Sequence, residues 1–246
     1  MNEHEMKKKS QRHYVLSRLT RKKLQIRRMV IQDYPLFALW RILFRTVDTM
    51  RGMLSAFIVG WPKSYLGAGS RIIGTRSIQI SEGIAIGRHA WIEAVTHYGE
   101  QIFTPVITIG KGFCAAESLH VAAINRIEIG DNCLFGSGIY IADHNHGSYA
   151  GDEQSSPSEP PVQRKLFSRG EVVIGSNVWL GDNVVIVGAV RIGSGVVIGA
   201  NSVVTHDIPK NVIVAGVPAK IIKQYNQVFG KWEKVSANSI QHEIHL

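Results

Sequence analysis

The sequence predicts an all-β fold, a parallel β-helix wound from six-residue repeats and preceded by an N-terminal helical segment. From residue 174 to residue 204 every sixth residue is aliphatic, and a small or branched residue lies four places after each one. A period of six fits neither a helix nor an alternating strand, and it is typical of a solenoid in which each coil stacks on its neighbours. The repeating aliphatic positions are Ile174, Leu180, Ile186, Ile192, Ile198 and Val204.

The first 28 residues carry most of the positive charge. They hold ten Lys or Arg against two Glu, a net charge of +8 out of +9 for the whole chain. A basic tail on a nearly neutral body favours an anchor or a solvated arm, whereas a nucleic-acid-binding domain carries its basic patch on the folded body. The sequence contains no basic stretch with interleaved aromatic residues. We therefore expect no nucleic-acid partner.

Residues 33–59 predict an amphipathic helix with basic flanks. Its charged residues recur every three or four places, at Arg41, Arg45, Asp48 and Arg51. These charges interrupt the segment too often for it to span a bilayer. Two interpretations stay open: residues 1–59 contact the anionic inner leaflet of the membrane, or the apolar side of the helix packs on the solenoid end or on a sister subunit. No signal peptide is visible, so we expect a cytoplasmic protein with peripheral membrane contact under the first interpretation.

The predicted organisation has three parts. Residues 1–60 form the basic and helical segment, residues 61–225 form the β-helix, and residues 226–246 form a C-terminal tail. Within the β-helix the repeat breaks over residues 94–106 and, as a longer loop excursion, over residues 142–171. Loops of this length are uncommon inside a regular fold unless they carry a function.

The longer excursion opens with the densest histidine cluster of the chain, Asp143-His144-Asn145-His146-Gly147. A histidine at the point where a coil opens into a loop is held by a rigid scaffold and can still meet a substrate. Because its pKa is ordinarily near neutral, such a side chain suits a general base. His120 points outward in the six-residue register, so it could line a cleft between neighbouring subunits.

Three segments resemble the hexapeptide-repeat acyltransferases, enzymes with left-handed parallel β-helices. They are the histidine run 143–147, the coil 173–181 (VIGSNVWLG) and the stretch 205–221 (THDIPKNVIVAGVPAKI), which is similar to the end of the family's solenoid. The resemblance covers about residues 67–225. It is strongest to the sugar O-acetyltransferases of polysaccharide biosynthesis, with similarity to galactoside and maltose acetyltransferases. The resemblance implies the left-handed winding, since the usual crossover rule would favour the right.

The resemblance also implies roles for individual residues. His144 matches the family's catalytic histidine, with His146 as the fallback, and would take the proton from an acceptor hydroxyl as its oxygen attacks acetyl-CoA. A backbone N–H near Asp182 matches the position that faces the thioester. Lys220 and Lys223 match basic residues near the CoA phosphates. The full set implied for acetyl-CoA binding is Trp179, Asp182, Ala200, Thr205, Lys220 and Lys223.

One stretch departs from the family pattern. Galactoside and maltose enzymes hold their sugar with an Asn and an Asp in the coil before the histidine, whereas residues 113–124 carry Ala or Glu near the first position and Ile near the second. We therefore expect another acceptor, a sugar or lipid-linked saccharide used in capsule, O-antigen or exopolysaccharide assembly. The resemblance further implies a homotrimer with clefts between its subunits, and no metal.

Two alternatives to this acetyl-CoA-dependent O-acetyltransferase stay open. A non-catalytic trimeric scaffold could dock at the membrane surface through residues 1–59. A metal hydratase similar to the γ-class carbonic anhydrases could use His120, His144 and His146, although the spacing of these residues departs from that class. The acetyltransferase is the interpretation that all three matching segments favour.

Overall fold

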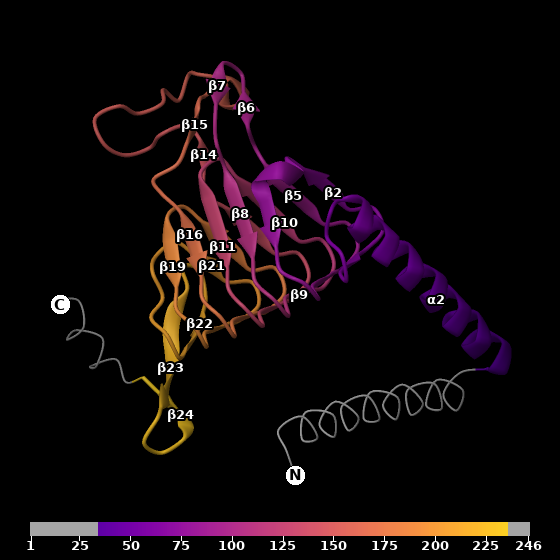
Figure 1. The fold of residues 1–246 in the computed structure, drawn as a ribbon. Helices are drawn as coiled ribbons and strands as arrows, with labels where there is room; N and C mark the ends of the chain where they lie inside the picture. Colours follow the sequence, from indigo (N-terminus) through magenta and orange to yellow (C-terminus); the bar gives the residue numbers. More distant parts are fainter. Residues whose placement is uncertain (1–33, 236–246) are drawn as a thin grey trace, which may run out of the picture. The chain divides into compact units, whose positions relative to one another are not determined.

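The structure, a computed structural model, describes residues 34–235. Residues 1–28, predicted to form a basic tail, lie outside the described residues, as does the end of the predicted C-terminal tail, residues 236–246. The chain divides into two compact units, Met1–Arg51 and Gly52–Leu246, and each is considered by itself. The second unit is a solenoid with three flat sides (Figure 1). The mostly-β architecture with one helix, predicted from the repeats, is confirmed for the described residues.

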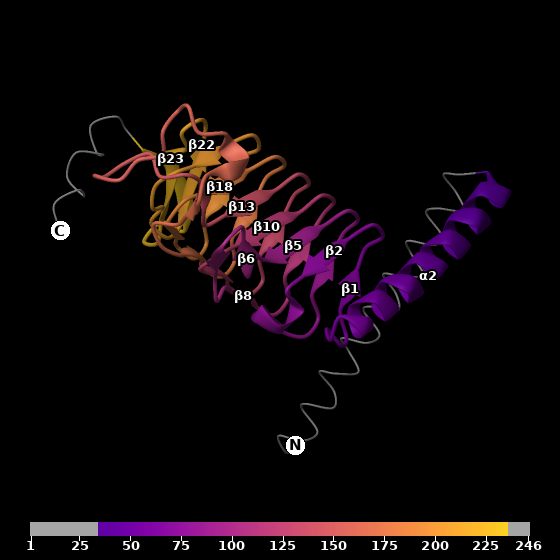
Figure 2. The ribbon, with the colours of Figure 1, turned by 90° about the horizontal axis from the view of Figure 1, so that it is seen from above.

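Each full coil contributes one short strand to each of three sheets, and the strands stack in parallel from coil to coil. Figure 2 shows successive coils following one another along the solenoid. Sheet A contains β1 (Tyr65–Leu66), β4 (Ala85–Ile86), β9 (Cys114–Ala115), β12 (Leu134–Phe135), β17 (Trp179–Leu180), β20 (Val197–Ile198), β22 (Val212–Ala215), β23 (Lys220–Asn226) and β24 (Lys231–Lys234). Sheet B contains β2 (Arg71–Ile73), β5 (Trp91–Ala94), β10 (His120–Ala123), β13 (Tyr140–Ala142), β18 (Val185–Val187) and β21 (Val203–Val204). Sheet C contains β3 (Ile78–Ile80), β8 (Val106–Ile109), β11 (Arg126–Ile129), β16 (Val172–Ile174) and β19 (Val190–Ile192).

The six-residue repeat places one aliphatic side chain per strand inside the solenoid. Leu180, Ile186 and Ile192 belong to three different sheets, and each is buried. The branched residues four places after each repeat position, such as Val178 and Val184, are buried as well. Stacking the coils therefore buries continuous aliphatic columns, and each coil is stabilised by the coils on either side of it.

The corners between sheet A and sheet B depend on residues that tolerate a left-handed backbone. Asn183 and Asn201 have φ values of 58° and 59°, a conformation that Asn adopts more readily than most residues. Asn183 Nδ2 donates to Asn201 Oδ1 (3.1 Å), which links two successive corners. Gly181 precedes one of these corners. A side chain is excluded at this position because a Cβ atom would lie 2.6 Å from the backbone nitrogen of Ala200.

Two hairpins leave the solenoid between sheet B and sheet C, where the repeat breaks. The first lies between β5 and β8 and consists of β6 (His97–Tyr98) and β7 (Gln101–Ile102). The second excursion runs from the end of β13 to the start of β16, residues 143–171, and pairs β14 (Asn145–His146) with β15 (Leu166–Phe167). Two short 3₁₀ turns complete the described elements, η1 (Thr75–Ser77) and η2 (Pro161–Gln163).

The two excursions are bound to each other. The Gln101 side chain donates to the carbonyl of Leu166 (3.1 Å) and accepts from the backbone N–H of the same residue (2.7 Å). Figure 1 shows β6, β7, β14 and β15 gathered above one corner of the solenoid. The paired excursions therefore form a fixed wall beside sheet B.

Sheet A ends in an antiparallel hairpin. β22 adds in parallel to β20, and β23 and β24 then follow as antiparallel strands. Tyr225 and Trp232 face each other across this hairpin with ring centroids 5.2 Å apart. β24 lies within the segment that the sequence predicted as a tail, because the aromatic pair and strand pairing hold it on the sheet.

The helix predicted over residues 33–59 is present as α2 (Pro35–Ile58). In the second unit, Ala56 is buried in the solenoid core, and Gly52 lies so close to Tyr65 that a Cβ atom would overlap its ring. Leu54 and Phe57 remain exposed, at 59% and 69%. The exposed apolar residues of α2 are Leu36, Phe37, Leu39, Trp40, Leu43, Phe44, Val47, Met50, Met53, Leu54, Phe57 and Ile58. Among residues 34–235, no helix combines the length and apolarity that crossing a bilayer requires.

Candidate functional site

A buried carboxylate marks the start of the second excursion. Asp143 directly follows β13 and has no exposed surface. Its Oδ1 accepts the backbone N–H of Ile124 (3.0 Å), and its Oδ2 accepts that of Asn125 (2.8 Å), both from the preceding coil. These two bonds hold the carboxylate in a single orientation, and they satisfy two backbone donors at the point where the chain leaves the regular sheet.

His144 is the next residue, and the same carboxylate orients its ring. Nδ1 of His144 lies 2.9 Å from Oδ1 of Asp143, and the side chain is 10% exposed. Because a carboxylate accepts hydrogen bonds, the geometry assigns the proton to Nδ1 and leaves a lone pair on Nε2. An imidazole in this tautomer accepts a proton through Nε2, as a general base must.

His146 has a different environment. Its Nδ1 lies 3.1 Å from the hydroxyl of Tyr98, and the two rings meet edge to face with centroids 5.2 Å apart. The Tyr98 hydroxyl donates to the carbonyl of Val162 (2.7 Å), so its oxygen accepts from the Nδ1–H of His146. His146 therefore joins the two excursions, and of the two predicted histidines only His144 has a buried carboxylate partner.

Three ring side chains follow one another on the outer face of sheet B, and we call them the ring row: Trp91, His120 and Tyr140. They occupy matching positions on β5, β10 and β13. Trp91 and His120 stack with centroids 4.4 Å apart, and His120 meets Tyr140 edge to face at 4.9 Å. All three side chains are partly exposed.

Charged groups surround the ring row. Burial lowers the pKa of His120; the Glu93 carboxylate opposes this shift and the nearby His144 adds to it. Burial also raises the pKa of Tyr140. Trp91 Nε1 donates to Glu93 Oε2 (2.9 Å), and the guanidinium of Arg71 lies 4.7 Å from the centre of the Trp91 ring. Within the ring row, His120 is thus the member whose pKa responds to His144.

The opposite edge of sheet B exposes unpaired backbone donors. At other corners a side chain from the next coil accepts the corner N–H: Ser194 Oγ accepts from Ser176 (3.0 Å), and Asp182 Oδ1 accepts from Ser137 (2.7 Å). The residue that corresponds to Ser194 above Asp182 is Ala200, which carries no acceptor. Within residues 34–235, the backbone N–H groups of Asp182 and Ala200 consequently have no hydrogen-bond partner.

The remaining residues implied for coenzyme binding lie on sheet A and at the end of sheet B. Trp179 belongs to β17 and is 52% exposed. Lys220 and Lys223 belong to β23, which is the third strand beyond β17 in the same sheet. Thr205 follows β21 and is exposed beside Val187 of the preceding coil.

Sheet B separates the predicted residues into two groups. His144, His146 and Thr205 lie at the edge where sheet B passes into sheet C. Asp182 and Ala200 lie at the other edge, where sheet A passes into sheet B. Within one chain, the strands of sheet B thus lie between the two groups.

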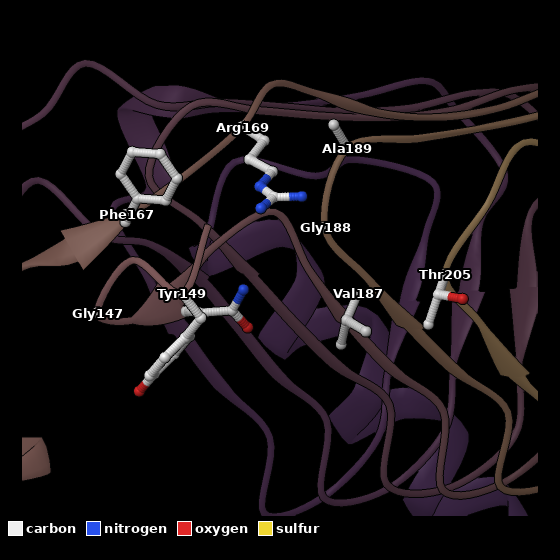
Figure 3. A pocket seen from close by; sticks show the side chains of 9 residues that line it. Gly147, Tyr149, Phe167, Arg169, Val187, Gly188, Ala189 and Thr205 are labelled. Atoms are coloured by element: carbon white, nitrogen blue, oxygen red, sulfur yellow. The ribbon is translucent and has the colours of Figure 1, made fainter. Parts of the chain in front are cut away.

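A pocket of about 220 Å³ lies beside the second excursion (Figure 3). The excursion forms one wall, and the corner at residues 187–189 together with Thr205 forms the other. Arg169 lies between Phe167 and Ala189 in Figure 3, and it has no ion-pair partner among the described residues. His144 does not line this pocket, so the pocket adjoins the proposed base and does not contain it.

Two of the three histidines proposed for the metal alternative have hydrogen-bond partners at Nδ1. Nδ1 of His144 is bound to Asp143, and Nδ1 of His146 is bound to Tyr98. In the part of the chain that the structure describes, no three His, Cys, Asp or Glu residues are grouped to hold a metal ion.

Sequence reasoning singled out His120 as an outward residue that could line a cleft, but it missed its neighbours Trp91 and Tyr140 and the nearby Glu93. It also assigned no role to Asp143. The signal lay in the register, because Trp91, His120 and Tyr140 occupy the outward position of successive coils. The spacing of 29 residues from Trp91 to His120 hides their common register, since the first hairpin is inserted between β5 and β10. Besides His144, the partners of Asp143 are two backbone N–H groups, which no residue pattern reports.

Two family descriptions match the solenoid. The family described as bacterial transferase hexapeptide (six repeats) matches residues 171–206. The hexapeptide repeat of succinyl-transferase matches residues 126–142.

Curated relatives match the chain over part of their lengths. WbbJ of Escherichia coli (strain K12), which carries the name of a lipopolysaccharide biosynthesis O-acetyl transferase, is 52% identical over 117 residues, covering 47% of this chain and 59% of WbbJ. The galactoside O-acetyltransferase of the same strain is 35% identical, covering 57% of this chain and 64% of that enzyme. The chloramphenicol acetyltransferase of Morganella morganii is 32% identical, covering 51% of this chain and 70% of that enzyme. The chain thus spans about three fifths of the first two relatives.

A solved structure shares the fold. AntD, an N-acyltransferase from Bacillus cereus in complex with dTDP and 3-hydroxybutyryl-CoA, superimposes with a TM-score of 0.51 at 19% identity, covering 68% of this chain and 82% of that chain. At this identity the likeness concerns the fold alone.

Proposed function

Because the chain belongs to the hexapeptide-repeat acyltransferases, we propose that it is an acetyl-CoA-dependent O-acetyltransferase acting on a sugar hydroxyl in capsule, O-antigen or exopolysaccharide assembly. The observation that carries the proposal is the buried Asp143 that orients His144 where the solenoid opens. The names of WbbJ and of the galactoside enzyme support the reaction type and the acceptor class.

His144 is the proposed general base. Its Nε2 takes the proton of the acceptor hydroxyl while the hydroxyl oxygen attacks the thioester carbon of acetyl-CoA. The C–S bond then breaks, and the proton on Nε2 passes to the departing CoA thiolate. Asp143 keeps Nδ1 protonated and stabilises the transient imidazolium. General base catalysis of this kind contributes roughly 10²–10⁴-fold.

The free N–H of Asp182 is the proposed donor to the developing oxyanion. It is preorganised by the corner turn and needs no rearrangement to donate to a negatively charged oxygen. The free N–H of Ala200, one coil further, would bind a carbonyl of the pantetheine arm. Trp179 and Thr205 would contact the same arm, and His146 would brace the wall of the site through Tyr98.

Lys220 and Lys223 are the proposed partners of the CoA phosphates. Adjacent strands lie about 4.8 Å apart, so β23 is roughly 14 Å from β17 along sheet A. This separation suits a coenzyme whose thioester lies near Asp182 and whose phosphates lie at the far end of the sheet. Lys side chains act there as point charges.

We infer a homotrimer of left-handed β-helices as the working assembly. The separation of His144 from Asp182 and Ala200 by the width of sheet B supports it, because two copies can bring opposite edges together. Mixing subunits tests this directly. His144→Ala and Ala200→Ser protein, denatured, mixed and refolded together, should regain activity above either variant alone, since some clefts then carry both native edges. Equal activity of mixed and unmixed samples would refute a shared site.

Calorimetric titration with acetyl-CoA and with CoA tests the enzyme assignment. We expect micromolar binding at one molecule per chain, together with thiol release from acetyl-CoA when a pyranoside acceptor is added. A well-folded protein that binds neither ligand would contradict the proposal. The non-catalytic scaffold would then be the better account.

The proposed organisation is a cytoplasmic enzyme whose residues 1–60 attach it to the inner membrane face, followed by the β-helix of residues 61–225 and the segment 226–246. The exposed apolar side of α2 supports membrane contact, since Leu43, Val47 and Leu54 lie on one side of the helix and are each more than half exposed. A lipid-linked saccharide acceptor would lie in the same plane.

Flotation with anionic phospholipid vesicles tests the attachment with a matched charge change. The double variant Leu43→Glu/Leu54→Glu should lose most vesicle binding, because each carboxylate enters the apolar side of α2. Thr49→Glu adds a carboxylate beside Arg45, on the side of the helix away from Leu43, and should retain binding. Equal flotation of all three proteins would exclude α2 as the anchor.

A further inference from the structure

The ring row presents an apolar, continuous surface on the outside of the solenoid. Trp91, His120 and Tyr140 come from three successive coils and contact one another in sequence, at 4.4 Å and 4.9 Å between centroids. The next outward residues on the same face in β18 and β21, Val185 and Val203, are aliphatic. The rings are therefore confined to the coils that precede His144, and they are not a general property of sheet B.

A carboxylate is fixed beside the rings. Glu93 lies two residues after Trp91 on β5, and Trp91 Nε1 holds its Oε2 at 2.9 Å. Its other carboxylate oxygen makes no hydrogen bond within the described residues. The positions beside Glu93 on the following two coils are Ala122 and Ala142, so no long side chain separates the carboxylate from the start of the excursion.

His120 is suited to contact a neutral ligand. Burial depresses its pKa, and although the Glu93 carboxylate opposes this, His144 adds to the depression, so the imidazole is favoured in its neutral form near neutral pH. A neutral imidazole offers one donor and one acceptor as well as an apolar ring face. Arg71 closes the far end of the row over Trp91, at 4.7 Å from the ring centre.

The order of these groups along the solenoid matches a two-substrate reaction. Glu93, Ala122, Ala142 and Val187 occupy matching register positions on successive strands of sheet B, and Thr205 directly follows the next strand, β21. His144 leaves the sheet from the middle of this series. The proposed coenzyme contact Thr205 thus lies on one side of the base, and the ring row with Glu93 lies on the other.

We propose that the ring row and Glu93 form the acceptor subsite, in which one face of a pyranose packs on Trp91 and His120 while its hydroxyls donate to Glu93. The C–H groups on one face of a pyranose are apolar and weakly positive, and they complement the negative faces of aromatic rings. A hydroxyl bound beyond Ala142 would then approach Nε2 of His144. This subsite rests on the proposed function, because it supplies the hydroxyl that His144 deprotonates.

The test measures sugar binding and transfer separately, using the methyl pyranosides of galactose, glucose, rhamnose and N-acetylglucosamine. Saturation-transfer NMR with irradiation of the aromatic protein protons should label the ring protons of a bound pyranoside, and Trp91→Leu should abolish this signal. Glu93→Gln and Trp91→Leu should each raise the acceptor KM about tenfold. The Kd for acetyl-CoA should not change in either variant.

Two matched variants serve as controls. Glu128→Gln makes the same chemical change on sheet C, where Glu128 pairs with Arg126 (3.1 Å), and should leave the acceptor KM unaltered. Trp179→Leu removes an exposed tryptophan of sheet A and should raise the Kd for acetyl-CoA without changing saturation transfer. Thermal unfolding of each variant excludes loss of fold.

Three results would overturn the subsite. Saturation transfer and acceptor KM that survive both Trp91→Leu and Glu93→Gln would show that the sugar binds elsewhere. No saturation transfer to any of the four pyranosides with wild-type protein would also reject it. A loss of trimer in Trp91→Leu by light scattering, without a change in acceptor KM, would assign the ring row to a second copy of the chain. Failure to bind acetyl-CoA, in contrast, would count against the proposed function while the NMR result still stands.

Discussion

The two edges of sheet B are made from one repeat, yet they present different chemistry. At the edge shared with sheet A the turns are regular, and the exposed groups are backbone N–H donors at Asp182 and Ala200. At the edge shared with sheet C the chain leaves the coil, and a buried carboxylate holds His144. At the first edge the N–H of Asp182 is free because Ala200 has no side-chain acceptor. At the preceding corner, Ser194 Oγ accepts the corresponding N–H of Ser176.

The difference shows what a regular coil cannot provide. Its interior is aliphatic, so a carboxylate placed there would lose its hydration without compensation. Asp143 is tolerated because the excursion begins at this point and the N–H groups of Ile124 and Asn125 turn toward it. A titratable side chain with a buried partner therefore depends on the excursion that interrupts the coil. A free backbone donor needs only a corner turn at which no side chain accepts the N–H.

The largest expected effect is at the interrupted edge. His144→Ala should lower kcat at least about hundredfold with the Kd for CoA nearly unchanged, because it removes the proposed base and leaves sheet A intact. His146→Ala should lower kcat only a few-fold. Steady-state kinetics on both variants decides between them. Retained activity in His144→Ala with loss in His146→Ala would exchange the two assignments.

The edge between sheet A and sheet B is tested by adding a side-chain acceptor for the N–H of Asp182. Ala200→Ser places a hydroxyl where it can accept from the N–H of Asp182, as Ser194 accepts from Ser176. We expect kcat to fall about tenfold, less than the 10²–10³-fold typical of deleting an oxyanion donor, because the hydroxyl competes for the N–H without removing it. Ser194→Ala frees the corresponding donor at another corner and should leave kcat unchanged. Equal kcat in Ala200→Ser and wild type would remove Asp182 from the mechanism.

The far end of sheet A should show a smaller effect. Lys223→Ala should raise the KM for acetyl-CoA about two- to fivefold, since an exposed charge contact contributes less than about 1 kcal/mol. The increase should shrink at high salt because screening weakens the wild-type contact. Lys111→Ala removes an exposed lysine that pairs with Asp131 and is the matched control. A KM change that ignores salt would argue against a phosphate contact.

The contact between the two excursions should matter least for chemistry. Tyr98→Phe removes the hydroxyl that His146 and Val162 share, and we expect kcat within about twofold of wild type. Losing such a bond costs about 1 kcal/mol locally, so amide hydrogen exchange over residues 143–171 should accelerate. Unchanged exchange would mean that the strand pair β14–β15 and Gln101 hold the wall without Tyr98.

The period of the sequence predicted the coils because every coil repeats the same local requirement. One inward aliphatic residue per hexad is visible as a pattern, and Ile186 can be placed from it. The helix α2 was predicted for the same reason, from its three- and four-residue spacing. The excursions were located by the absence of the pattern.

Other features of the site depended on contacts between distant residues. The hairpin inserted after β5 hides the common register of Trp91 and His120 in the sequence. Only the pairing of β5 with β10 shows that the two residues are neighbours. His144 and His146 are nearly equivalent in the sequence, and only their partners distinguish them.

The sequence by itself determined the solenoid, the place where it opens and the residue types available there, since these follow from local periodicity and its interruption. Only the tertiary structure decided that Asp143 is buried against two backbone N–H groups, that Asp182 has an uncapped donor, and that sheet B lies between Asp182 and His144. The physical reason is that burial, hydrogen-bond satisfaction and separation across a sheet belong to pairs of coils, and no single hexad encodes them.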